Sequence, residues 1–102
     1  MRRGTTPTLQ ITVTGLSKIE IQVLHLIIEQ QGVVIKKTEQ DVSIDGEVIS
    51  AALTQEETLS LTAGMDVAVQ LRVLSKSGTA CASNIVPVPV GEILEDGVIS
   101  GD

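Results

Sequence analysis

The chain has 102 residues, with 13 acidic and 7 basic side chains and a formal net charge of −6. It contains no Phe, Tyr or Trp, which excludes sites built on ring faces, such as sugar clefts, single-stranded nucleic-acid platforms and methyl-ammonium cages. The acidic balance argues further against nucleic acid, because phosphate binding needs clustered cations. Apolar runs are four residues or fewer, so we expect no membrane span.

The length predicts one domain, residues 1–102, in which 91–102 form a C-terminal extension. A single cysteine, Cys81, excludes an internal disulfide, and a single histidine, His25, excludes a His-pair metal site. The N-terminus has a basic start without an apolar run behind it, so we do not expect a secretory signal. We expect no cofactor and no bound metal.

The first predicted strand spans Thr8–Thr14, where Leu9, Ile11 and Val13 alternate with polar residues. The next stretch is ambiguous, because Ser17 and Glu20 have capping-box spacing, which allows one helical turn before the following strand. Leu24, Leu26 and Ile28 then share an inward face, with His25 and Ile27 opposite. A turn at 30–32 returns the chain as a hairpin partner over Val33–Thr38.

The middle of the chain predicts a second hairpin followed by a short helix. A strand over Val42–Ile44 ends at Asp45-Gly46, a strong two-residue hairpin signal. Its partner, Glu47–Leu53, has Ile49, Ala51 and Leu53 on the core face. Thr54 and Glu57 then have the spacing of a capping box, which predicts one or two helical turns that carry Leu59 and Leu61 and end near Gly64.

The last third predicts two strands. Asp66–Ser75 alternates most clearly, with Val67, Val69, Leu71 and Val73 inside. After a turn at Ser77-Gly78, Thr79–Val90 is predicted as one long strand. The pattern therefore predicts an all-β fold, an immunoglobulin-like antiparallel β-sandwich of about seven strands, with one short helical turn before the sixth. It lacks the paired cysteines, core Trp and corner Tyr of antibody-type domains.

Pro87 and Pro89 stand two apart in the last strand, so they remove backbone donors from the same edge. This spacing is typical of an edge strand that cannot recruit another sheet. The alternative is a polyproline-like docking segment.

Side chains with catalytic or metal-binding chemistry are scattered rather than clustered. Seven acids and no base lie between Thr38 and Leu71. One interpretation of these acids is a carboxylate pair for general acid–base catalysis, or a calcium site. The other interpretation is an acidic face that is exposed to solvent. His25 has no nearby nucleophile in the sequence, and Cys81, flanked by alanines, is expected to be a small, partly buried thiol. We therefore expect no catalytic residue and no enzymatic activity.

The C-terminal extension carries two apolar pairs beyond the last predicted strand. They either fold back on the domain or contact another subunit. On the second interpretation the partner-binding residues are Ile93, Leu94, Val98 and Ile99.

The order of several segments resembles a group of small proteins encoded among the structural genes of phages and prophages of Gram-positive bacteria. The segments are Arg3–Thr8, Leu53–Leu59, Val69–Leu74, Gly78–Ser83 and Val90–Ile99, of which Leu-Thr-Gln-Glu-Glu-Thr-Leu is the most specific. In outline the chain is also similar to the immunoglobulin-like N-terminal domain of phage baseplate upper proteins. Unlike the usual pattern of the group, this chain has no aromatic residue in its core.

The resemblance implies a non-enzymatic virion component of the tail, baseplate or head–tail region, assembled in the cytoplasm of the bacterial host. Its expected partners are other virion or tail proteins, or further copies of itself, and neither nucleic acid nor a membrane. The alternatives are a free-standing bacterial interaction or adhesion module, and a small hydrolase, which is disfavoured because no nucleophile–base pair can be assembled.

Overall fold

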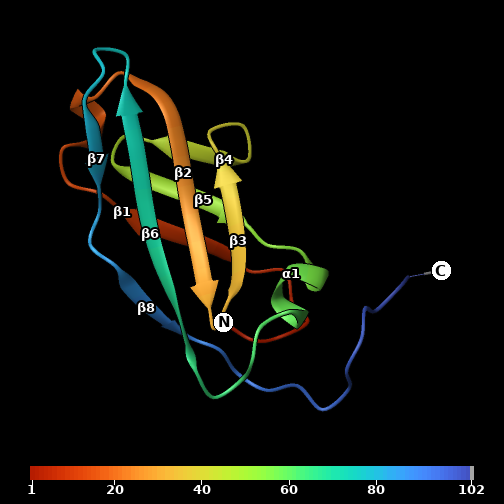
Figure 1. Cartoon of the computed structure of the whole chain (residues 1–102). Helices are drawn as coiled ribbons and strands as arrows, with labels where there is room; N and C mark the ends of the chain where they lie inside the picture. The colour runs from red at the N-terminus through yellow and green to blue at the C-terminus, as the bar shows by residue number, and fades with distance from the viewer. Residues whose placement is uncertain (102) are drawn as a thin grey trace.

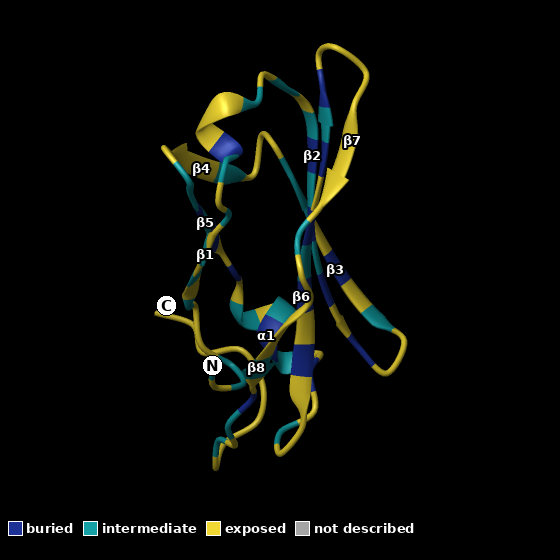
Figure 2. Ribbon diagram, turned by 90° about the vertical axis from the view of Figure 1, so that its left-hand side faces the viewer, coloured by how far each residue is buried: buried dark blue, intermediate teal, exposed yellow. Residues whose placement is uncertain are grey.

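The computed structural model describes residues 1–101, which form two antiparallel sheets packed face to face (Figure 1, Figure 2). The smaller sheet has the order β1-β5-β4, with β1 at Thr8–Thr12, β4 at Val42–Asp45 and β5 at Val48–Ala52. The larger sheet has the order β3-β2-β6-β7. β8 also pairs with β6, at residues 66–69, whereas β7 pairs at residues 72–74. Its strands are β2 (Ile21–Gln30), β3 (Val33–Thr38), β6 (Asp66–Ser75), β7 (Ala80–Ala82) and β8 (Val86–Pro89).

The core lies between the sheets and is entirely aliphatic. Figure 2 shows the two layers edge-on, with buried residues alternating with more exposed ones along the strands. On β6 the four predicted inward residues, Val67, Val69, Leu71 and Val73, are all at most 5% exposed. On β2, in the same sheet, and on β5, in the facing sheet, buried residues alternate with half-buried or exposed ones in the same way. The predicted core faces of all three strands are therefore confirmed.

The chain crosses between the two sheets after β1, after β3 and after β5. The predicted antiparallel sandwich is therefore confirmed, with eight strands rather than seven. Crossings of this kind are those of Greek-key sandwiches, the class to which the immunoglobulin fold belongs. The short helix α1 (Gln55–Leu59) precedes β6, the sixth strand, where a helical turn was predicted.

The prediction of one long strand over Thr79–Val90 was wrong. The Leu71 amide donates to the Ser83 side-chain hydroxyl (2.9 Å) instead of a backbone carbonyl, and the Ser83 amide donates to the Leu71 carbonyl (2.8 Å). Beyond this point the register on β6 shifts by one residue, from Arg72↔Ala82 to Val69↔Val86. One extra residue breaks the ladder into β7 and β8, as in a β-bulge.

Two local turn predictions also need correction. The turn after β1 is a 3-10 helix, η1 (Leu16–Lys18), but Gly15 stands at its N-cap with φ 85°, and no side chain caps it, so Ser17 and Glu20 form no capping box. In the β4–β5 hairpin Asp45 pairs with Val48, which leaves Gly46 as the first of the two loop residues, with φ 61°. Glycine at that position is typical of a type II′ turn.

The alternation on β6 predicts different costs for two neighbouring substitutions. Leu71 is 1% exposed, whereas Arg72 lies on the outer face of the sheet and is exposed. We expect Leu71→Ala to lower the free energy of unfolding by ~2–5 kcal/mol, because a cavity is left in the core. Arg72→Ala should change it by less than ~0.5 kcal/mol. Urea titrations of both variants decide this, and equal losses would contradict the observed faces.

Candidate functional site

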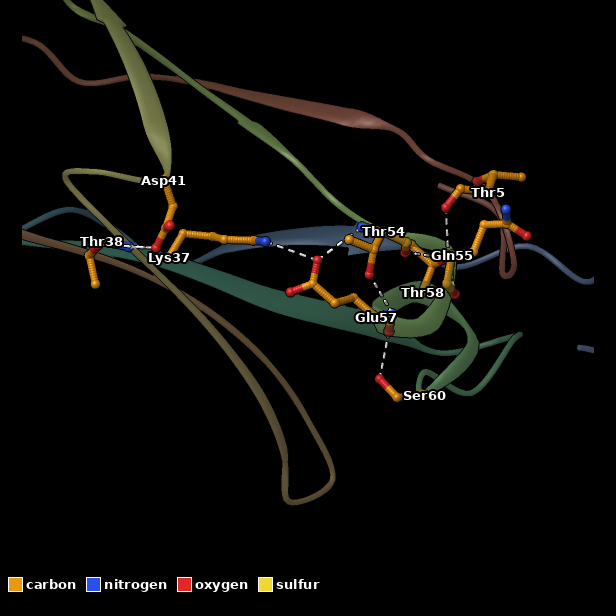
Figure 3. Close-up of polar contacts among 9 residues, drawn as sticks. All are labelled: Thr5, Lys37, Thr38, Asp41, Thr54, Gln55, Glu57, Thr58 and Ser60. Atoms are coloured by element: carbon orange, nitrogen blue, oxygen red, sulfur yellow. Dashed lines mark hydrogen bonds and ion pairs between the residues drawn. The ribbon is translucent and has the colours of Figure 1, made fainter. Parts of the chain in front are cut away.

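Helix α1 is fixed at its start by side chains of its own sequence. The Glu57 amide donates to the Thr54 hydroxyl (3.1 Å), and the Thr54 amide donates to the Glu57 carboxylate (2.9 Å), as Figure 3 shows. These reciprocal bonds are the predicted capping box, and they satisfy amides that the first helical turn leaves free. The helix is a single turn that ends at Leu59, shorter than the predicted limit near Gly64.

Two further contacts hold α1 against the rest of the molecule (Figure 3). The buried Thr58 hydroxyl donates to the Thr5 carbonyl (2.8 Å), so the helix is joined to the N-terminal segment. Lys37 on β3 forms an ion pair with the Glu57 carboxylate at 2.9 Å, and the two side chains are only 14% and 27% exposed. Partial burial makes this pair less screened by solvent than an exposed surface salt bridge.

The environment of Glu57 favours its charged form. Partial burial by itself would raise the pKa of the carboxyl group. Hydrogen bonds from Lys37 and from Thr54, together with the positive charge of Lys37, outweigh that effect and hold the pKa of Glu57 below its ordinary value. The carboxylate therefore stays ionised and serves the helix cap and β3 together.

The C-terminal end of α1 is held by an arginine from the start of the chain. Arg3 donates through Nε to the Leu61 carbonyl (2.7 Å) and through Nη2 to the Leu59 carbonyl (3.0 Å). The last carbonyls of a helix have no partner within the helix, and a cation stabilises them. The same Nη2 forms an ion pair with Asp96 of the C-terminal segment at 3.1 Å. Arg3 thus joins the helix to the C-terminal segment.

Residues 1–3 lie beside Gly91, where the C-terminal segment begins. Arg2 forms an isolated parallel bridge with Gly91, and the Arg3 amide donates to the Gly91 carbonyl (3.0 Å). Gly4 has φ +70°, and a Cβ at this position would lie 2.8 Å from Cδ1 of Ile93. Glycine is favoured there because a side chain would strain the left-handed backbone and would also displace the end of Ile93. Ile93 therefore packs on the N-terminal segment.

Gln55 fixes the far part of the C-terminal segment through both of its side-chain groups. Its Nε2 donates to the Ile99 carbonyl (3.1 Å), and its Oε1 accepts from the Ile99 amide (2.8 Å). Arg2 adds a bond from Nη1 to the Glu92 carbonyl (2.6 Å). The backbone of this segment is consequently held on its own domain at both ends.

The four residues predicted to bind a partner are not equivalent. Ile93 is half-buried against the domain. The other three expose most of their side chains: Leu94 is 108%, Val98 55% and Ile99 69% exposed. Leu94, Val98 and Ile99 therefore lie on one segment whose backbone is held at Glu92 and Ile99, with their apolar atoms in solvent. We call these three residues the tail surface.

The residues that fix the tail surface were not identified from the sequence. Gln55 lies 44 residues from Ile99, and Arg3 lies 93 residues from Asp96, so no local spacing indicates either contact. A glycine and two arginines near the start of the chain were the only available signal, and such residues are common in unstructured ends.

The histidine and the cysteine, the side chains best suited to catalysis or metal binding, both lie on the larger sheet. His25 is half-buried on the outer face of the larger sheet, between Thr38 and Arg72 in register. Cys81 is exposed, not partly buried as predicted, because it lies on a three-residue edge strand. Among residues 1–101, no three His, Cys, Asp or Glu side chains are grouped as a metal site requires.

Comparisons with known proteins give no relative: no family model, curated protein or solved structure matches the chain. In the part of the chain that the structure describes, no helix is long and apolar enough to span a membrane.

The capping box predicts a specific role for the Thr54 hydroxyl. Thr54→Ala should lower the free energy of unfolding by ~0.5–2 kcal/mol, because the Glu57 amide loses its acceptor. Thr54→Ser keeps the hydroxyl and is the matched control. Denaturant unfolding of the two variants tests this, and equal losses in both would mean that the hydroxyl does not cap the helix.

The Lys37–Glu57 pair predicts a pH-dependent contribution to stability. Because the folded-state pKa of Glu57 is lowered, the contribution is present above the unfolded value of about 4.3. It is lost as the pH falls through the lowered folded-state pKa. Glu57→Gln resembles the protonated residue, so the difference in Tm between wild type and variant should be larger at neutral pH than in acid.

Glu56→Gln, which changes an exposed neighbour on the same helix, is the control for that comparison. At neutral pH it should lower the Tm less than Glu57→Gln does. A Glu57→Gln difference that is the same in acid as at neutral pH would contradict the ion pair.

Proposed function

We propose that this chain is a non-enzymatic structural protein of a phage or prophage, which binds other virion or tail proteins through the tail surface. The observation that carries the proposal is the combination of an anchored backbone with exposed aliphatic side chains. Gln55 and Arg3 hold the segment in place, while Leu94 and Ile99 remain in solvent. The proposal of a phage origin is supported by the resemblance of the sequence segments described above.

Anchoring favours binding because less freedom is lost when a partner arrives. A free C-terminal tail would have to be ordered at the interface, at a cost for every immobilised residue. Here the bonds from Gln55 and the pairing of Gly91 with the N-terminal segment have already met part of that cost. Exposed aliphatic side chains on such a segment are typical of the centre of a protein–protein contact.

The charges around the tail surface define the chemistry of the partner. Asp96 pairs with Arg3, whereas Glu92 and Glu95 form no ion pair within residues 1–101. A complementary surface would therefore have an apolar centre and lysines or arginines at its rim. Such a partner would bind faster at low ionic strength, because attraction between exposed charges is screened by salt.

Incorporation into particles tests the proposal. An epitope-tagged copy of the chain is expressed in the bacterium that carries the gene, the prophage is induced, and gradient-purified particles are analysed by immunoblotting. We expect the wild-type chain in the particles and a loss of at least about tenfold for the Leu94→Asp/Ile99→Asp double variant, since burying an unpaired charge at the contact costs more than 1.4 kcal/mol.

Val34→Asp is the matched control. Val34 is 57% exposed on β3 and is not part of the tail surface, so this variant should be incorporated like the wild type. Thermal melts verify that all three proteins fold. Absence of the wild-type chain from the particles, or equal incorporation of the double variant, would contradict the proposal. Recovery of the chain only from the cell surface would favour a free-standing interaction module instead.

A further inference from the structure

Four of the five strand edges in the two sheets are poorly suited to pairing with another chain. On β8, Pro87 and Pro89 have no amide hydrogen to donate. β3 carries the exposed Lys36, whose charge opposes a neighbouring strand. β4 is four residues long and ends at Asp45, and β7 has three residues. Short, charged or proline-bearing edges of this kind protect sheets against pairing.

β1 is the exception. Within residues 1–101 it pairs only with β5, and its five residues include no charge and no proline. The Val13 amide donates to the Glu47 carbonyl, just beyond the end of that pair. This bond shows which residues of β1 direct their backbone groups toward β5. In an antiparallel pair, alternate residues direct their backbone groups to opposite sides. The residues that direct their amides and carbonyls outward are therefore Thr8, Gln10 and Thr12.

An apolar groove runs beside this free edge, between β1 and β8. Besides Gln10, it is lined by Leu9, Ile11, Leu26, Val69, Val86 and Val88, and a second pocket beside the β7–β8 bulge shares Ile11 and Val86 with it. Leu26 and Val69 at its base are core residues, only 1% and 4% exposed, so the groove is shallow and its apolar walls are formed by β1 and β8. A strand added to β1 would cover the groove with its inward side chains.

We propose that a second copy of this chain pairs antiparallel with β1 through the partner's β1, about a two-fold axis at Gln10. The proposal is independent of the tail surface. Between identical chains every alternative uses a protected edge, so β1 against β1 is the favoured pairing. A two-fold contact must also be self-complementary, and this strand is.

In that arrangement Thr8 faces the partner's Thr12, and Gln10 faces the partner's Gln10. The outward backbone groups of both strands then bond to each other, and Leu9 lies opposite the partner's Ile11 on the apolar side. Each chain has a net charge of −6, so two copies repel each other overall. The contact at β1 adds no local repulsion, because this strand carries no charged residue. The two smaller sheets become one continuous six-stranded sheet.

A charge exchange at Gln10 tests the pairing. Gln10 is exposed, its backbone groups point away from β5, and its side chain makes one long, exposed bond to the Ser50 hydroxyl (3.4 Å). Gln10→Lys and Gln10→Glu should therefore leave the monomer folded. Sedimentation velocity from about 1 µM to about 1 mM should show a monomer–dimer equilibrium for the wild type. Each variant should dimerise at least about tenfold more weakly, because like charges stand directly opposite each other. An equimolar mixture of the two variants should regain the dimer.

Ser43→Lys, on the exposed outer face of the same sheet, is the control and should dimerise like the wild type. The Leu94→Asp/Ile99→Asp variant should also dimerise normally, so failure of the tail surface and failure of this pairing are distinguishable. In the wild type, hydrogen exchange at the Gln10 and Thr12 amides should slow as the concentration rises.

A wild type that stays monomeric up to the highest concentration would overturn the proposal. So would a dimer that neither Gln10 variant weakens, a mixture that does not restore it, or Gln10 and Thr12 amides that exchange equally fast at all concentrations.

Discussion

The two sheets are held together by aliphatic side chains alone, and the rest of the structure depends on that constraint. Because the core contains no aromatic side chain, it is filled by many smaller aliphatic side chains that contact one another. Many of them come from the long strands β2 and β6, where buried residues alternate with half-buried or exposed ones. Leu24, Leu26 and Ile28 on β2 lie in register with Val73, Leu71 and Val69 on β6. This pairing places the centre of the sandwich, and a one-residue slip would turn every apolar side chain outward.

An aliphatic core offers no hydrogen bonds, so the ends of the chain are placed by polar contacts at its margin. The short helix α1 is where these contacts converge: Glu57 binds Lys37 of β3, Thr58 binds the N-terminal segment, and Gln55 binds Ile99. Arg3 completes the arrangement by bonding to both the helix end and Asp96. One turn of helix thereby links the larger sheet to both ends of the chain and sets the position of the tail surface.

The sequence predicted what depends on local periodicity and spacing. The inward faces of β2, β5 and β6 and the Thr54–Glu57 capping box follow from patterns within a few residues, and all are confirmed. The break between β7 and β8 was missed, because it depends on Ser83 bonding to a strand twelve residues away. The apolar pairs near the C-terminus were recognised as candidates, but their anchoring by Gln55 and Arg3 joins residues too far apart for any sequence pattern.

The C-terminal segment is held on its own domain while its apolar side chains face solvent. Amide hydrogen exchange of the free chain, followed by NMR, measures this anchoring. The Ile99 amide should exchange at least about tenfold more slowly than in an unfolded peptide, because it donates to Gln55. In Gln55→Ala that protection should disappear, while the Leu26 amide in the core stays protected. An Ile99 amide that exchanges at the unfolded rate in the wild type would contradict the account.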